Sequence, residues 1–209
     1  MIPIKLMPSS EKYARVVDSL KVYDTVVEPF LHKHIGAEAV SEMQSMREEG
    51  LKPIPEDASD EEKYEKAYKN FIWQAKANMS FIRERLGEDG IEKFKRAEAD
   101  ELTKTNSGIA VFMLGMIRAI SGSTAFKMIA KQLGYEFQWI TPFSMTELTK
   151  NKAVYDVPQC KVLEFPDSED VCAIGCQGIY PIWLAEQLKV DMRFKRQGKS
   201  CTVTVTPLR

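Results

Sequence analysis

The sequence predicts an α+β protein, with a helical N-terminal part packed on a C-terminal domain that contains a small antiparallel β-sheet. Two observations support this fold class. Apolar residues recur at helical spacing through roughly the first 130 residues, whereas the alternation of apolar and polar residues that is typical of strands appears only after them. We therefore divide the chain into a helical region, residues 1–121, and an α/β region, residues 122–209, which can also form one continuous domain.

The beginning of the chain predicts two helices. Apolar residues follow the helical period over residues 13–30, and Ser9 precedes them as a cap. Pro29 should kink this helix or begin its last turn, because proline lacks the backbone donor that a helix interior needs. Gly36 suits the residue after the helix end, and residues 37–49 form a second, shorter helix.

A linker with two prolines, residues 50–58, leads to the longest helical pattern. Ser59 and Glu62 have the spacing of a capping box, in which each residue satisfies a backbone N–H of the other. The helix that they open carries an apolar stripe and ends at Gly87. Three further helices are expected, over residues 91–104, 109–120 and 124–133.

The charge pattern gives no reason to expect nucleic acid or a membrane as partner. Residues 41–104 contain 16 acidic and 12 basic side chains, interleaved as on the solvated faces of amphipathic helices. The net charge is −1, whereas a DNA-binding surface needs a basic excess. The most apolar run, residues 108–117, is stopped by Arg118 and is shorter than the ~20 residues of a membrane span.

The first residues also lack the apolar core of a secretory signal. We therefore expect a cytoplasmic protein, in which cysteines serve as thiols, metal ligands or redox groups rather than as structural disulfides.

The C-terminal third predicts the sheet and one more helix. Residues 135–140 alternate like a half-buried strand, a short helix is expected near residues 143–150, and residues 153–165 form an extended run. Pro181 fits the first turn of a helix that runs to Leu188, because that position needs no backbone donor.

The chain ends in a predicted hairpin that turns at residues 198–200. The two strands carry apolar residues at every second position. This period of two places Cys201 on the apolar side of the last strand, so we expect an inward-facing thiol.

The four cysteines, Cys160, Cys172, Cys176 and Cys201, leave three interpretations open. Free cysteine is among the most buried residue types, so core packing is the first. Ligation of zinc or another transition metal by three or four of them is the second, although only Cys172 and Cys176 lie close enough in sequence to form a hook. A reactive thiol at Cys172 or Cys176 is the third.

Cys176 is the leading candidate for a catalytic thiol. Gly175 and Gly178 lie on either side of it and permit close approach of a ligand. The helix expected at Pro181 follows directly, and a helix N-terminus would lower the pKa of the thiol. Tyr180, in the same stretch, is a candidate ligand contact.

Two further positions are candidate ligand contacts. Arg118 can hold an anionic ligand in a pocket walled by Met113 and Met116, or it can extend to the surface from its apolar helix. Trp139 is either a core residue or a ligand wall.

The last third of the chain resembles a family pattern. Gly134 ends a helix, Cys160 ends the extended run VYDVPQC, and Gly198 opens the motif G-x-x-C-x-V-x-V that contains Cys201. This arrangement resembles the 4-vinyl-reductase-like ligand-binding domain and the related L-2-amino-thiazoline-4-carboxylic acid hydrolase-like proteins. The resemblance covers about residues 122–206. It implies an α/β domain, often dimeric, that holds a small organic ligand and, in some members, a metal through cysteines.

Two positions depart from the family pattern. Sensor members carry a metal-binding cysteine eight residues before the last one, where this chain has Arg193. Hydrolase-like members tend to carry a cysteine beside an acid, where this chain has Val190 and Asp191.

As its leading function, the resemblance implies an enzyme similar to thiazoline-carboxylate hydrolases. It would act on a small anionic or sulfur-containing molecule, with Cys176 as the key thiol or metal ligand. The alternatives are a non-catalytic small-molecule or metal-binding sensor, and an interaction module with buried structural cysteines. A homo-oligomer is expected, and the mutual distance of the four sulfur atoms separates the interpretations.

Overall fold

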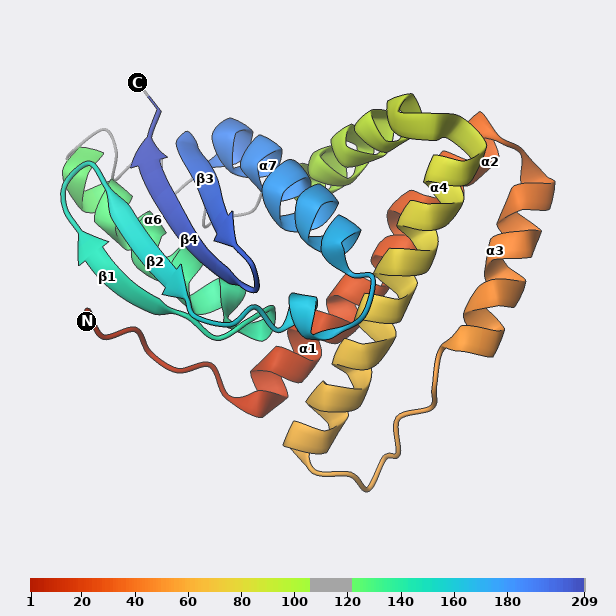
Figure 1. The fold of residues 1–209 in the computed structure, drawn as a ribbon, viewed down its shortest axis with the longest axis horizontal. Helices are drawn as coiled ribbons and strands as arrows, with labels where there is room; N and C mark the ends of the chain where they lie inside the picture. Colours follow the sequence, from red (N-terminus) through yellow and green to blue (C-terminus); the bar gives the residue numbers. More distant parts are fainter. Residues whose placement is uncertain (106–121, 209) are drawn as a thin grey trace.

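The computed structural model describes residues 1–105 and 122–208, and it shows the predicted α+β architecture (Figure 1). Long helices from the N-terminal half lie beside a four-stranded antiparallel sheet from the C-terminal half. Buried side chains from both halves form a single hydrophobic core. The helix predicted over 109–120 lies outside the described residues, together with Arg118, Met113 and Met116.

The N-terminal pattern folds into consecutive helical segments rather than one kinked helix. Pro29 stands in the first turn of the second α-helix, directly after a π-helical segment. Gly36 follows that helix and has a φ of 117°. Residues with a Cβ atom rarely adopt this backbone conformation, so glycine allows the chain to change direction here. The segments are α1 (Ser9–Leu20), the π-helical η1 (Tyr23–Val27), α2 (Glu28–His34) and α3 (Ala37–Gly50).

The longest element, α4 (Asp60–Thr105), consists of two helices joined at a kink. The capping box is confirmed: the Glu62 N–H donates to Ser59 Oγ at 3.3 Å, and the Ser59 N–H donates to Glu62 Oε2 at 3.0 Å. Gly87 has a φ of 66° and a ψ of −163°, so the chain bends there. The first half of α4 packs along α1, and both halves support the C-terminal part.

The sheet has the strand order β1-β2-β4-β3, and every neighbouring pair is antiparallel. The predicted hairpin is confirmed, with Gly198 in its turn at a φ of 59°. Tyr155, Val203 and Phe194 lie opposite one another across three strands, so they share one face of the sheet. The strands are β1 (Ser144–Leu148), β2 (Ala153–Val157), β3 (Val190–Gln197) and β4 (Ser200–Pro207).

Two predictions between residues 135 and 150 are wrong. The expected strand over 135–140 is the end of α6 (Gly122–Glu136), followed by the 3-10 turn η2 (Phe137–Trp139). The Gln138 side chain holds this turn by donating to the Gly134 carbonyl at 3.1 Å and accepting from the Met7 N–H at 3.0 Å. The expected helix over 143–150 is instead β1, because it pairs with β2. Tertiary contacts override the local pattern in both places.

The extended run predicted over 153–165 is only partly confirmed. Strand β2 ends at Val157, and Pro158 follows it. Proline has no N–H to donate to a neighbouring strand, so pairing stops there. The chain then forms the short 3-10 helix η3 (Val162–Glu164).

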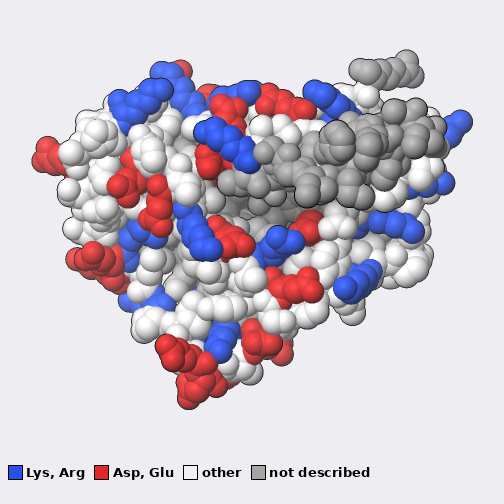
Figure 2. All heavy atoms as spheres, turned by 180° about the vertical axis from the view of Figure 1, so that it is seen from behind, with Lys and Arg blue, Asp and Glu red and all other residues white. Residues whose placement is uncertain are grey.

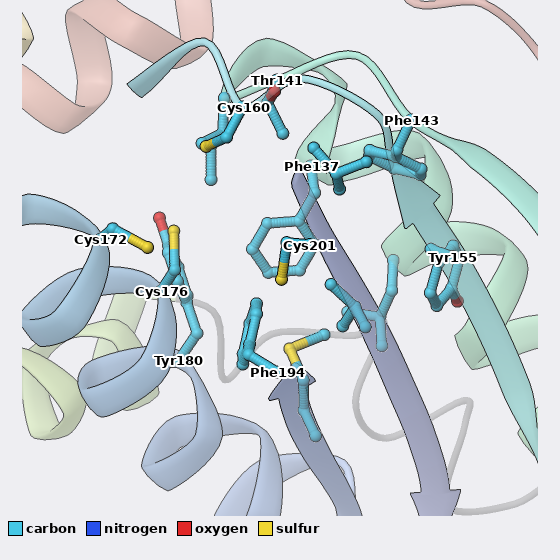
Figure 3. A pocket seen from close by; sticks show the side chains of 15 residues that line it. Phe137, Thr141, Phe143, Tyr155, Cys160, Cys172, Cys176, Tyr180, Phe194 and Cys201 are labelled. Atoms are coloured by element: carbon cyan, nitrogen blue, oxygen red, sulfur yellow. The ribbon is translucent and has the colours of Figure 1, made fainter. Parts of the chain in front are cut away.

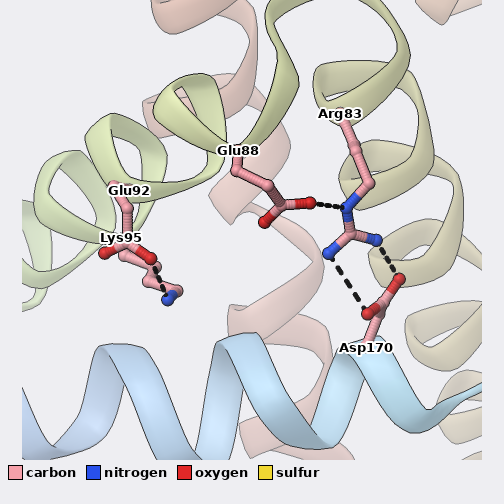
Figure 4. A network of polar contacts seen from close by, with 5 residues as sticks. All are labelled: Arg83, Glu88, Glu92, Lys95 and Asp170. Carbon is pink, nitrogen blue, oxygen red and sulfur yellow. Dashed lines mark hydrogen bonds and ion pairs between the residues drawn. The ribbon is translucent and has the colours of Figure 1, made fainter.

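A π-helical segment that the sequence did not predict precedes the helix at Pro181. This segment, η4 (Val171–Ile179), runs directly into α7 (Tyr180–Gln187), whose first turn contains Pro181 as predicted. The Arg83 guanidinium of α4 donates hydrogen bonds to both carboxylate oxygens of Asp170, the residue just before η4 (Figure 4). It also donates to Glu88, which lies beyond the kink in α4. These contacts fix the start of η4 against α4.

Charges of both signs are interspersed over the surface. On the face shown in Figure 2, acidic and basic side chains of the described residues alternate without forming one continuous basic area. Within the described residues, every helix is too short or too polar to cross a lipid bilayer.

Candidate functional site

All four cysteines line one cavity, which we call the four-cysteine cavity (Figure 3). It contains about 650 Å³ of empty space, counting its open mouth. Strands β2, β3 and β4 form one wall, the end of α6 with η2 forms a second, and η4 with α7 forms the third. Segments far apart in the sequence therefore meet at this cavity.

Two of the thiols come from the sheet side. Strand alternation turns Cys201 toward the cavity, as predicted, and pairs it with Val157 of β2. Cys160 lies three residues after β2, where its N–H donates to the Lys199 carbonyl of the hairpin turn at 2.7 Å. The hairpin turn and the end of β2 thus bring Cys160 and Cys201 to the same end of the sheet.

The other two thiols come from η4. Cys172 and Cys176 are four residues apart, so they share a helical face, and that face borders the cavity. The Gln177 amide donates to Cys172 Sγ at 3.4 Å. The flanking glycines have different roles: a Cβ at Gly178 would come within 3.0 Å of Lys95 Cε, whereas one at Gly175 would meet nothing within 4 Å. Gly178 therefore serves helix packing.

Aromatic rings complete the walls. Phe137 and Tyr180 pack edge to face with ring centroids 4.9 Å apart, which joins η2 to α7 across the cavity. Phe143 and Tyr155 pack in the same way at 5.5 Å, and the Tyr155 hydroxyl donates to the Ala130 carbonyl at 2.6 Å. These contacts give the cavity a built framework before any ligand is bound.

Burial disfavours the thiolate at Cys160, Cys176 and Cys201. It raises the pKa of Cys176 well above its ordinary value, and the negative charges of the other three thiolates would raise it further. Burial likewise raises the pKa of Cys160, and it raises that of Cys201 to about 11. The predicted lowering of the Cys176 pKa is wrong. Cys176 lies inside the continuous helix η4–α7, not before its N-terminus.

The described walls of the cavity offer no charge to an anionic ligand. None of the described residues that line it is charged, and its polar side-chain atoms are confined to thiols, the Thr141 hydroxyl and two tyrosine hydroxyls. The anion contact predicted at Arg118, with Met113 and Met116, lies outside the described residues. The described walls suit a neutral, largely apolar molecule.

The thiols have the donor chemistry of a zinc site, but their present arrangement does not fit one. Zinc requires ligands converging at about 2.3 Å from the ion. No group of three or more His, Cys, Asp or Glu side chains within residues 1–105 and 122–208 is placed to hold a metal ion. Cys160, Cys172, Cys176 and Cys201 thus share a cavity without forming a ligand cage.

The remaining two candidate ligand contacts, Tyr180 and Trp139, lie in different places. Tyr180 lies in the cavity wall, where the sequence suggested a ligand contact. Trp139 lines neither this cavity nor the second one described below. It is buried, its ring packs edge to face on Phe71 at 5.2 Å, and its carbonyl accepts a hydrogen bond from Tyr64.

Several cavity residues were missed by the sequence reading. Met192, Phe194 and Val203 were assigned to the apolar side of the hairpin, but nothing in their spacing showed that this side borders a cavity. Phe137 lines the cavity from η2, whereas its segment was predicted to be a strand.

Comparisons with known proteins add no family assignment. The sequence matches no protein-family model and no curated protein. The resemblance to the 4-vinyl-reductase-like domain and to the thiazoline-carboxylate hydrolases therefore stays a prediction.

Proposed function

We propose that this protein binds a small, neutral and largely apolar molecule in the four-cysteine cavity and holds it without a covalent step. The observation that carries the proposal is the convergence of four thiols and several aromatic rings on one cavity whose described walls carry no charge. Protonated thiols are polarizable and only weakly polar, so they suit sulfur-containing or aromatic ligands. This function corresponds to the ligand-binding or sensor alternative.

The hydrolase-like function has weaker support from the same site. A thiol attacks substrates as the thiolate, and burial disfavours the thiolate of Cys176. No histidine lines the described part of the cavity to act as a base for it. An enzyme that depends on Cys176 is therefore our second candidate. It rests on the position of Cys176, which lines both this cavity and the second one described below.

The test uses benzothiophene, a neutral bicyclic sulfur compound, and measures the melting temperature of the protein. Ligand at 100 times its Kd stabilises a protein by about 2.7 kcal/mol, so a rise of roughly 5–10 °C is expected. Cys201→Leu fills the cavity and should abolish the rise. Thr202→Leu, on the opposite face of the same strand, should leave it intact. An equal rise in all three proteins would contradict the proposal.

A turnover assay separates the second candidate from the first. L-2-amino-thiazoline-4-carboxylic acid is the substrate that the resemblance implies. Hydrolysis of this acid by the wild type, lost in Cys176→Ser, would favour the enzyme. Binding of benzothiophene without hydrolysis favours the binding protein.

Cytoplasmic location and homo-oligomerisation belong to the proposal as well. Reduced thiols in a cavity of this kind suit a reducing compartment. Fractionation of the native cell and sedimentation of the purified protein test the two statements separately.

A further inference from the structure

A second cavity lies on the other side of the η4–α7 helix, against α1 and both halves of α4. It contains about 790 Å³ of empty space, counting its open part. Cys176 and Tyr180 line both cavities and form part of the wall between them. Unlike the described lining of the four-cysteine cavity, the α4 wall of this one carries amide and carboxyl side chains.

Asn78 brings an unpaired acceptor into this cavity. Its side chain is 5% exposed, and its Oδ1 atom has no hydrogen-bond partner among the described residues. An unpaired buried polar atom destabilises the folded protein, so a ligand that donates a hydrogen bond to it is favoured. Gln74, one turn earlier, is satisfied: its amide donates to the Leu20 carbonyl at 3.0 Å and accepts from Arg47 at 3.1 Å. The Asn78 side-chain oxygen thus differs from that of Gln74 in having no hydrogen-bond partner among the described residues.

Glu98 brings an unpaired carboxyl group to the same cavity from the second half of α4. Within the described residues it forms no hydrogen bond or ion pair, and it is the only charged residue among those that line the cavity. The titratable groups that face it from η4 and α7 are the weak acids Cys176 and Tyr180. Burial, without a compensating cation, raises the pKa of Glu98 to about 7.

The rest of the lining is apolar and aromatic, with Phe71, Met79 and Phe94 among its members. A carboxylate and an amide oxygen that lack donors are complemented by a group that carries several N–H bonds and a positive charge. Aromatic walls attract such a cation and accommodate the carbon skeleton attached to it. A neutral ligand would leave the carboxylate without a counter-charge.

We propose that this second cavity binds a primary amine with an apolar body, whose ammonium group donates to Glu98 and Asn78. The site is distinct from the four-cysteine cavity and does not depend on the function proposed there. The two sites touch only at shared wall residues such as Tyr180.

Calorimetric titration at pH 8 with three amines tests this proposal. Benzylamine, 2-phenylethylamine and tryptamine are each compared with the alcohol that has the same skeleton. At least one amine should bind at least 10-fold more tightly than its alcohol. Glu98→Gln, which keeps the shape and removes the charge, should abolish this preference. Asn78→Leu should weaken amine binding by a smaller factor.

Two control variants locate the effect. Glu92→Gln alters an exposed carboxylate on the same helix, one that pairs with Lys95, and should leave amine binding unchanged. Cys201→Leu should also leave it unchanged, although it blocks the four-cysteine cavity. The proposal is overturned if none of the three amines binds more tightly than its alcohol, or if the preference survives in Glu98→Gln. Neither result bears on benzothiophene binding, so the two proposals fail separately.

Discussion

Cys176 and Tyr180 lie one helical turn apart across the junction of η4 and α7, and both side chains border two separate cavities. The Tyr180 ring also packs against Phe137 on one side and Trp183 on the other, with centroids 4.9 and 6.5 Å apart. The partition between the cavities therefore depends on a helix that η2 and α4 hold in place.

Replacement of Tyr180 by alanine should join the two cavities. Truncation of a large aromatic side chain in a packed site costs about 3–5 kcal/mol, and the half-buried Tyr180 should fall near the lower end. Tyr180→Phe keeps the ring and its edge-to-face contact, so it should cost less than about 1 kcal/mol. Urea unfolding measures both. Equal losses in the two variants would show that the ring does not support the partition.

The thiols of Cys176 and Cys201 should react slowly in the folded protein. A pKa of about 11 for Cys201 leaves a thiolate fraction about 100-fold below that of a free thiol at neutral pH, and Cys176 should be slower still. Alkylation by iodoacetamide, followed by mass spectrometry of each cysteine peptide, measures the rates at pH 7.5 and in urea. Slow alkylation that a chelator accelerates would instead show that the thiols are bound to a metal.

The parts of the fold that the sequence predicted are those with local causes. The capping box at Ser59 contains its own hydrogen bonds, and the hairpin at Gly198 joins two alternating strands. Pro181 lies in the first turn of α7 as predicted, but the π-helical η4 that precedes it was not predicted. Strand β1 has no such local cause. It exists because β2 lies beside it, so its short pattern was misread as a helix.

Only the part of the site that has a local cause was predicted from the sequence. A period of two is enough to turn Cys201 inward, but only the packing of η4–α7 against the sheet brings Cys172 and Cys176 to the cavity that Cys201 lines. Glu98 was missed because the charged helix was read as solvated. A signal existed: Glu98 interrupts an apolar stripe formed by Ile91, Phe94 and Leu102.

The bidentate pair of Arg83 and Asp170 should control access to the η4 thiols. Arg83→Met keeps the length of the side chain and removes its hydrogen bonds to Asp170 and Glu88. The start of η4 should then open more often, and Cys172 should be alkylated at least about 3-fold faster. The stability loss should stay below about 1 kcal/mol, because the pair is partly exposed.

Lys93→Met is the matched control for Arg83→Met. It breaks an exposed ion pair with Asp89 on the same helix, away from η4. The alkylation rate of Cys172 should stay at the wild-type value in this variant. Equal acceleration in both variants would mean that general loosening of α4, and not the Asp170 contact, exposes the thiol.

Glu98 should make the protein less stable as the pH rises. Its pKa is about 7 in the folded protein and 4.5 without burial, so the folded state holds the proton more tightly. Between these two values the folded state binds more protons than the unfolded state, and the free energy of unfolding therefore falls with increasing pH, by at most about 3 kcal/mol. Glu98→Gln lacks this titration and should be more stable than the wild type at pH 8 but not at pH 4. Urea unfolding at both pH values measures the difference in stability between the variant and the wild type, in which the contributions of the other titrating groups cancel.

Glu92→Gln serves as the control and should follow the wild type. If Glu98→Gln also follows the wild type at both pH values, the carboxyl group is solvated, and the amine site would lose its desolvated acceptor.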